Sequence, residues 1–104
     1  MASMDMEERY RLIMSTIFRA LGFRVEVERM LATGRIDMIV EVSSFIYVLE
    51  LSNNGGISAA ENQIKDKSYT EPFKADKRKV IALAVELDET GKGLIDWKEV
   101  DESL

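Results

Sequence analysis

Apolar residues recur at two different spacings along this chain, and the spacing predicts which segments are helices and which are strands. From Met6 to Leu21 they recur every three or four residues, which is typical of an amphipathic helix. Residues 23–28 alternate between apolar and charged side chains, as a half-exposed strand does. Residues 35–42 and 45–52 are mostly apolar and are bounded by turn residues, which indicates two buried strands. The first half of the chain is therefore expected to form a helix followed by three strands.

The second half of the chain predicts one more helix and one or two more strands. Ser58 and Glu61 have the spacing of a capping box with serine at the N-cap, so we expect a helix from about residue 59 to residue 69. Residues 79–87 are nearly all apolar, as in a central strand covered on both faces, and residues 94–100 indicate a weaker last strand. The expected fold class is α/β (α+β), with the element order αβββαβ(β) and a mixed β-sheet flanked by helices. Its β-α-β crossover is expected to be right-handed.

The composition limits the chemistry that this chain can perform. Its 104 residues, 46% hydrophobic and 32% charged, suit a single domain spanning residues 1–104. The chain has no cysteine, which excludes disulfides, zinc–thiolate sites and thiol nucleophiles, and no histidine, the commonest general base. Catalysis would have to use carboxylate, lysine, tyrosine or serine side chains, or a hard metal ion such as Mg²⁺.

Charge and hydropathy indicate the expected partners and location. The formal net charge of −5 argues against a simple electrostatic nucleic-acid binder, although a bound metal ion would supply positive charge locally. No apolar run approaches the ~20 residues of a membrane span, and the start of the chain does not resemble a signal peptide. We therefore expect a cytoplasmic protein without a membrane partner.

Two carboxylates, those of Asp37 and Glu50, lie within the predicted buried strands. If Ser43 and Ser44 form a two-residue turn, the numbers of paired residues sum to 87, and Asp37 lies directly opposite Glu50. Like charges on neighbouring strands, with Cβ atoms about 5 Å apart, are destabilising. A divalent cation held between the two carboxylates would remove this repulsion. In the alternative interpretation, both carboxylates are solvated on an open sheet face and Arg35 neutralises Glu50.

Several short motifs follow one another in a fixed order from residue 8 to residue 97. They are Leu-Gly-Phe at 21–23, Gly-Arg-Ile-Asp at 34–37, Tyr-Val-Leu-Glu at 47–50, Gln-Ile at 63–64, Tyr-Thr-Glu-Pro-Phe at 69–73 and Lys-Val-Ile at 79–81. Together with the element order, these motifs resemble the PD-(D/E)XK nuclease superfamily. More narrowly, they resemble the nuclease-like domain found at the C-terminus of AAA-ATPase-like bacterial proteins. The resemblance implies a restriction-endonuclease-like core.

The resemblance also implies a metal site built on the two carboxylates. Asp37 matches the family's metal-binding aspartate, and Glu50 matches its second acidic ligand. The backbone carbonyl at Leu51 usually completes the metal shell, and Glu8 on the first helix corresponds to an additional carboxylate found in some members. The implied cofactor is Mg²⁺, with Mn²⁺ as a substitute, which polarises the phosphate and lowers the pKa of the attacking water. The implied reaction is phosphodiester hydrolysis of nucleic acid, with DNA as the expected partner.

Position 52 departs from the family's motif. The motif has a lysine two residues after the glutamate, beside the scissile phosphate, whereas this chain has Ser52. A short, neutral serine cannot replace it, and the loss could remove about 3–4 kcal/mol of transition-state stabilisation. Lys67 is the expected substitute, ahead of Lys65, because it shares a helix face with Gln63. Gln63 and Tyr69 match positions that face the site. A natural pseudoenzyme or an inactivating substitution would explain Ser52 equally well.

The sequence leaves three functions open. The first is a metal-dependent nuclease whose catalytic positions are Asp37, Glu50, Ser52 and Lys67. The second is a catalytically inactive nuclease-like module that binds nucleic acid or protein. The third is an EF-hand-like calcium-binding loop at residues 88–99, in which a lysine occupies an oxygen-ligand position and would repel the ion. A homodimer and an ATPase-like domain or partner also remain open.

Overall fold

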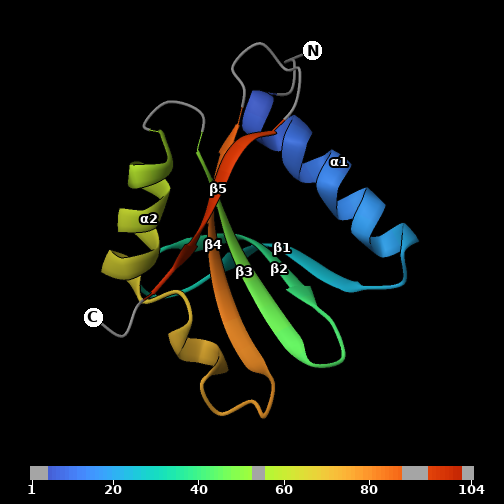
Figure 1. The fold of residues 1–104 in the computed structure, drawn as a ribbon, viewed down its shortest axis with the longest axis vertical. Helices are drawn as coiled ribbons and strands as arrows, with labels where there is room; N and C mark the ends of the chain where they lie inside the picture. The colour runs from blue at the N-terminus through green and yellow to red at the C-terminus, as the bar shows by residue number, and fades with distance from the viewer. Residues whose placement is uncertain (1–4, 53–55, 88–93, 102–104) are drawn as a thin grey trace.

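Two α-helices, a short 3₁₀ helix and a five-stranded sheet make up the described part of the chain, which covers residues 5–52, 56–87 and 94–101 of a computed structural model. The elements are α1 (Met6–Ala20), β1 (Arg24–Met30), β2 (Arg35–Glu41), β3 (Phe45–Ser52), α2 (Gly56–Lys67), η1 (Glu71–Phe73), β4 (Lys79–Leu87) and β5 (Leu94–Val100). This order confirms the predicted α+β class, including the last strand (Figure 1). Within the described ranges, no helix has both the length and the apolar character needed to cross a membrane.

The strands lie in the sheet in the same order as in the chain, β1-β2-β3-β4-β5. β3 and β4 are parallel, with α2 in the crossover between them, and the other neighbouring pairs are antiparallel. The two helices pack on opposite faces of the sheet (Figure 1). Successive strand residues therefore contribute to different cores, with Val48 in the core of Ile64 from α2 and Leu49 in the core of Phe18 from α1. β2 and β3 both contain runs of consecutive buried residues, so both strands are covered on both faces.

The β2–β3 hairpin has the register that the sequence predicts. Its ladder pairs Met38 with Leu49 and Glu41 with Ile46, so the numbers of paired residues sum to 87. The strands are connected through the short turn at 43–44. Because side chains alternate between faces along a strand, this register decides which residues of the paired segments 38–41 and 46–49 become neighbours.

Helix α1 is capped at both ends. Asp5 is the N-cap, and its Oδ1 accepts a 2.7 Å hydrogen bond from the N–H of Glu8, whose Oε2 accepts in return from the N–H of Asp5 at 3.4 Å. At the other end Gly22 has a φ of +91°, and its N–H donates to the carbonyl of Arg19 at 3.0 Å. The chain therefore turns back at once into β1, and α1 lies against β1 and β2.

Helix α2 begins and ends earlier than the sequence predicts. Its first residue is Gly56, whose φ of +71° only glycine adopts readily, so Ser58 lies inside the first turn and the predicted N-cap is wrong. The helix ends at Lys67, and Ser68 follows with a φ of +51°. The N–H groups of Ser68 and Tyr69 donate back to carbonyls of the last turn, both at 3.3 Å, in a Schellman motif. This reversal turns Tyr69 back toward the sheet, where it joins the core on the α2 face.

Candidate active site

Asp37 and Glu50 lie together at the end of the β2–β3 hairpin that is remote from its turn. The ladder ends at Met38 with Leu49, and Asp37 and Glu50 are the next residues of the two strands and interact with each other. Both side chains are buried, Asp37 with 1% and Glu50 with 7% of its surface exposed. Oδ2 of Asp37 accepts a 2.8 Å hydrogen bond from the backbone N–H of Leu51. The hairpin register therefore brings two carboxylates into a space from which water is largely excluded.

Two arginines face the other oxygen of the Asp37 carboxylate. Nη1 of Arg11, on α1, lies 4.0 Å from Oδ1 of Asp37, and Nη2 of Arg35, on β2, lies 3.9 Å from the same atom. Arg11 was not among the site residues predicted from the sequence. The pattern that could have predicted it is the i, i+4 spacing of the polar residues Glu7, Arg11 and Ser15, which places them on one face of α1. Arg11 and Ser15 are both buried.

Glu28 lies on the other side of Asp37, in β1. The β1–β2 ladder is paired on both sides of Glu28, which places this residue level with Asp37. Its φ of +55° is uncommon for a residue other than glycine. The Glu28 carboxylate forms a salt bridge with Arg11, and its Oε1 lies 3.8 Å from Nη1 of Arg35. Arg35 thus lies between the carboxylates of Glu28 and Asp37 and not against Glu50, the partner considered in the alternative interpretation of the sequence.

A further carboxylate, that of Glu7, reaches the group from α1. Its Oε1 lies 3.8 Å from Nη1 of Arg11. Burial, and after it the negative charge of Asp37, raises the pKa of Glu7 to about 7. Glu8, the helix residue named from the sequence, is exposed and belongs to the capping box instead. The difference arises because successive helix residues point about 100° apart, so only one of the two neighbours can face Asp37.

Glu50 is the most strongly perturbed carboxyl group of this cluster. Burial raises its pKa to about 10, together with the hydrogen bond and charge of Asp37 and the charge of Glu7, while a hydrogen bond with Tyr69 acts in the opposite direction. Its Oε2 atom is buried without a hydrogen-bond partner in the described part of the chain. A buried polar atom without a partner is rare in folded proteins and needs an explanation. Glu50 therefore carries a proton at neutral pH unless a cation compensates its charge.

The Tyr69 hydroxyl connects α2 to the carboxylates. Tyr69 is fully buried, and its oxygen accepts a 3.1 Å hydrogen bond from Nε2 of Gln63. Burial raises the pKa of Tyr69, so the hydroxyl keeps its proton and can donate it to Glu50. A Cβ atom at Gly34 would lie 3.0 Å from the Tyr69 oxygen, closer than side chains normally approach. Gly34 therefore allows β2 to pass close enough for the hydroxyl to reach the site.

Comparison with known proteins decides the family. A model of the PD-(D/E)XK nuclease superfamily matches residues 5–97. This chain belongs to the PD-(D/E)XK nuclease superfamily. A relative from Azotobacter chroococcum mcd 1, described as an uncharacterized protein in the vnfD 5′ region, is 32% identical over 103 residues. The match covers 94% of this chain and 19% of the relative, so the chain spans about a fifth of that protein's length. No solved structure matches the chain.

Ser52, which the sequence resemblance matches to the superfamily's motif lysine, is buried at the end of β3. Lys67, the substitute expected from the sequence, is half-buried at the end of α2. Its backbone carbonyl accepts a 2.8 Å hydrogen bond from the Thr33 hydroxyl, which holds this end of α2 against the start of β2. Lys65 pairs with an acidic side chain of its own helix at 3.9 Å. The backbone of Lys67 is therefore attached to the segment before β2, whereas the side chain of Lys65 pairs within its own helix.

The superfamily's cofactor is a divalent metal ion, and the charges of this site suit one. The site consists of four carboxylates and two guanidinium groups, those of Glu7, Glu28, Asp37, Glu50, Arg11 and Arg35. When all four carboxylates are ionised, four negative and two positive charges leave −2, which one divalent cation would neutralise. In the described ranges no group of three or more acidic side chains is arranged to hold a metal ion by itself. A cation would therefore take Asp37 and Glu50 together with backbone and water oxygens, as Mg²⁺ commonly does.

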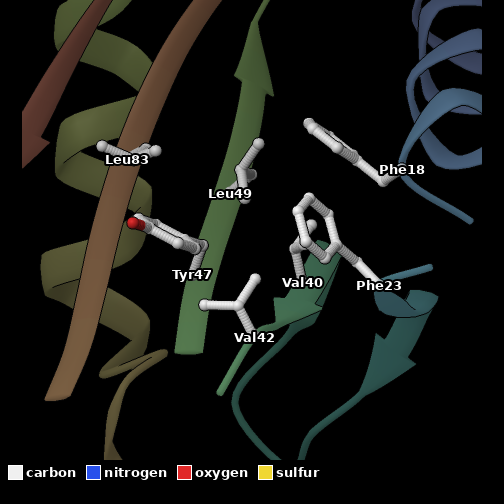
Figure 2. Close-up of a pocket in the computed structure, with 7 residues that line it drawn as sticks. All are labelled: Phe18, Phe23, Val40, Val42, Tyr47, Leu49 and Leu83. Carbon is white, nitrogen blue, oxygen red and sulfur yellow. The ribbon is translucent and has the colours of Figure 1, made fainter. Parts of the chain in front are cut away.

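The carboxylates do not line the apolar hollow on the α1 face of the sheet (Figure 2). That hollow has a volume of about 430 Å³ and is lined by Phe18, Phe23, Val40, Val42, Tyr47, Leu49 and Leu83. A smaller depression of about 160 Å³ is lined by Glu50 and Ser52 of β3, their neighbour Leu51, and Gln63 among the residues of α2. Glu50 and Ser52 are therefore reached from solvent through a depression between β3 and α2.

Proposed function

We propose that this domain hydrolyses phosphodiester bonds of DNA, with Mg²⁺ as its cofactor and Mn²⁺ as a substitute. The observation that carries the proposal is the buried pair of Asp37 and Glu50, in which Oε2 of Glu50 has no hydrogen-bond partner in the described part of the chain. Such an oxygen is a ready donor for a cation, since carboxylate oxygen is the ligand that hard cations prefer. Membership of the superfamily supports the same chemistry.

Asp37, Glu50 and the carbonyl of Leu51 would hold the metal ion, and Glu7, in place of the Glu8 expected from the sequence, is the α1 carboxylate beside Asp37. When bound, the ion polarises the phosphate and lowers the pKa of the attacking water. The reaction consumes one water for each bond. The water oxygen forms a bond to phosphorus, the bond from phosphorus to the ester oxygen breaks, and the ester oxygen leaves with a proton.

The protein's own groups orient the two carboxylates. The N–H of Leu51 holds Oδ2 of Asp37 and leaves Oδ1 for a cation. Gln63 orients the hydroxyl of Tyr69, and that hydroxyl in turn restrains the carboxylate of Glu50. A site that is held in position before its ligand arrives loses less entropy on binding and reacts faster.

The second candidate function is a non-catalytic module that binds nucleic acid or protein through the same surface. Ser52 favours it, because a site without the motif lysine lacks a positive charge that the superfamily uses at the phosphate. Residues 88–93 of the EF-hand-like loop at 88–99 lie outside the described part of the chain.

We further propose that the domain works beside an ATPase-like domain or partner, and as a homodimer when it cuts two strands. The similarity to a relative about five times longer supports an additional domain, because the match leaves about four-fifths of that protein for other functions. The location expected for such an enzyme, which acts on cellular DNA, is the cytoplasm.

A cleavage assay combined with metal titration tests the nuclease function. Single-stranded and double-stranded DNA and RNA are incubated with Mn²⁺ and the wild type, Asp37→Asn or Ser52→Lys, while calorimetry measures Mg²⁺ binding. Asp66→Asn is the matched control, since it removes an exposed carboxylate of α2. We expect metal binding and cleavage to be lost in Asp37→Asn and retained in Asp66→Asn. If neither the wild type nor Ser52→Lys binds metal or cuts any substrate, the domain is not a nuclease.

A further inference from the structure

Arg35 is the first residue of β2, and Ser52 is the last residue of β3. The two strands are antiparallel, and their ladder runs from Glu41 with Ile46 to Met38 with Leu49. Beyond that last pair, the N–H of Leu51 donates to the side chain of Asp37. The start of β2 and the end of β3 lie at the same end of the hairpin, so a cation lies at the end where the superfamily's lysine is missing.

The Arg35 guanidinium is near the site without being bound tightly to it. Its Nη2 lies 3.9 Å from Oδ1 of Asp37 and its Nη1 lies 3.8 Å from Oε1 of Glu28. Both distances exceed the roughly 2.7–2.9 Å of a charge-assisted hydrogen bond. The side chain is 47% exposed, so its N–H groups can also reach a ligand from solvent. Arg35 is therefore positioned to contact a group that sits against Asp37.

The other cations near the site are less suited to that contact. The Arg11 side chain is only 9% exposed and is surrounded by Glu7, Glu28 and Asp37, which makes it a structural partner of these carboxylates. Lys67 is half-buried, and its side chain passes beside Gly34, with Cγ 3.5 Å from where a Cβ atom would be. Arg35 alone among these three combines direct proximity to Asp37 with an exposed side chain.

We propose that Arg35 binds the phosphate of the nucleic-acid substrate and supplies the positive charge that the motif lysine supplies in the superfamily. This inference rests on the proposed nuclease function. The planar guanidinium donates two parallel N–H bonds to two phosphate oxygens, a geometry in which arginine is stronger than lysine. Arg35 forms and breaks no covalent bond. It stabilises the charge on the phosphate oxygens while water replaces the ester oxygen at phosphorus and the ester oxygen leaves with a proton.

The test compares five variants with the wild type: Arg35→Gln, Arg35→Lys, Ser52→Lys, the double variant Arg35→Gln/Ser52→Lys, and Lys67→Gln. Arg24→Gln is the matched control, because it removes a strand arginine that pairs with Glu41 outside the site. Cleavage of DNA in Mn²⁺ gives kcat and KM, calorimetry gives Mg²⁺ affinity, and circular dichroism confirms the fold.

We expect Arg35→Gln to lower kcat by about 100- to 1000-fold, the effect of removing one transition-state donor. Its Mg²⁺ affinity should not fall, since Arg35 competes with a cation for Oδ1 of Asp37. Ser52→Lys should restore cleavage in the Arg35→Gln background while adding little to the wild type. Arg35→Lys should keep part of the activity. If Arg35→Gln does not fold, Arg35→Lys serves as the test instead.

Three results would overturn the inference. Cleavage by Arg35→Gln at the wild-type rate would show that Arg35 does not act on the phosphate. Loss of activity that Ser52→Lys does not rescue would mean that Arg35 has only a structural role. A larger loss in Lys67→Gln than in Arg35→Gln would assign the charge to Lys67. Absence of both metal binding and cleavage in the wild type is a different result, since it removes the nuclease function itself.

Discussion

The backbone N–H of Leu51 donates a 2.8 Å hydrogen bond to Oδ2 of Asp37. This bond joins β3 to a side chain of β2 one step beyond the backbone pair of Met38 and Leu49. It satisfies a strand donor, and it orients a buried carboxylate while using only one of its two oxygens. The same contact therefore contributes to the stability of the hairpin end and to the geometry of the candidate metal site.

Two substitutions at Asp37 separate the hydrogen bond from the charge. Asp37→Ala and Asp37→Asn both remove the charge, but only asparagine keeps an oxygen that can accept from the N–H of Leu51. We expect Asp37→Ala to be less stable than Asp37→Asn by about 1–3 kcal/mol, the typical effect of a buried donor left without a partner. Urea unfolding at pH 7 without metal measures the difference. Equal stability of the two variants would mean that the bond contributes nothing.

Gly34→Ala tests the close approach of β2 to Tyr69. The new Cβ atom would lie 3.0 Å from the Tyr69 oxygen, so the ring or the strand must move. We expect the substitution to reduce the free energy of unfolding by about 1–3 kcal/mol, as overpacking in a core does. Tyr69→Phe removes the atom that clashes, so Gly34→Ala should be less harmful in the Tyr69→Phe background. Strictly additive effects in this double-mutant cycle would show that the hydroxyl does not exclude a side chain at position 34.

The stability of the metal-free protein should fall as the pH rises from about 5 to 8. The pKa of Glu7 is raised from 4.5 to about 7, so the native state holds a proton there that the unfolded chain has released. Stability decreases with pH wherever the native state binds more protons than the unfolded state. The raised pKa of Glu50 extends the decrease above pH 7. Thermal unfolding in EDTA measures the slope.

Two controls identify the origin of this slope. Glu7→Gln cannot titrate, so it should flatten the decrease between about pH 5 and pH 7. Excess Mg²⁺ should raise the melting temperature most at the alkaline end, where the carboxylates are ionised, because a ligand that binds only the native state stabilises it. A melting temperature that rises with pH in EDTA would contradict the assignment of raised pKa values to these groups.

Arg11→Met should destabilise the protein by removing the buried cation from among the carboxylates. We expect a loss of about 3 kcal/mol, the lower end of the range for breaking a buried ion pair, because Glu28 is partly exposed. The double variant Arg11→Met/Glu28→Gln should recover part of this loss, since it also removes one of the unpaired charges. Arg9→Met changes an exposed arginine of the same helix and should have little effect. Chemical denaturation of the four proteins measures these differences, and equal losses in Arg9→Met and Arg11→Met would refute the structural role of Arg11.

The features of the site that could be predicted from the sequence are those that depend on residues close together in the chain. The short turn at 43–44 and the alternation of side chains along β2 and β3 determine the register of the hairpin, and the register brings Asp37 close to Glu50. The stop of α1 at Gly22 follows in the same way from the backbone freedom of one residue. The start of α2 was not predicted correctly, because the capping pattern at Ser58 competes with the turn that Gly56 permits.

The sequence by itself therefore determined the order of the elements, the register of the central hairpin and the carboxylate pair, because each depends on residues close together in the chain. Only the tertiary structure decided that Glu7 and Arg11 of α1 face Asp37, since the rotation of a helix against a sheet depends on packing over its whole length. It likewise decided that Tyr69 reaches Glu50, because the turn after α2 and the space at Gly34 act together.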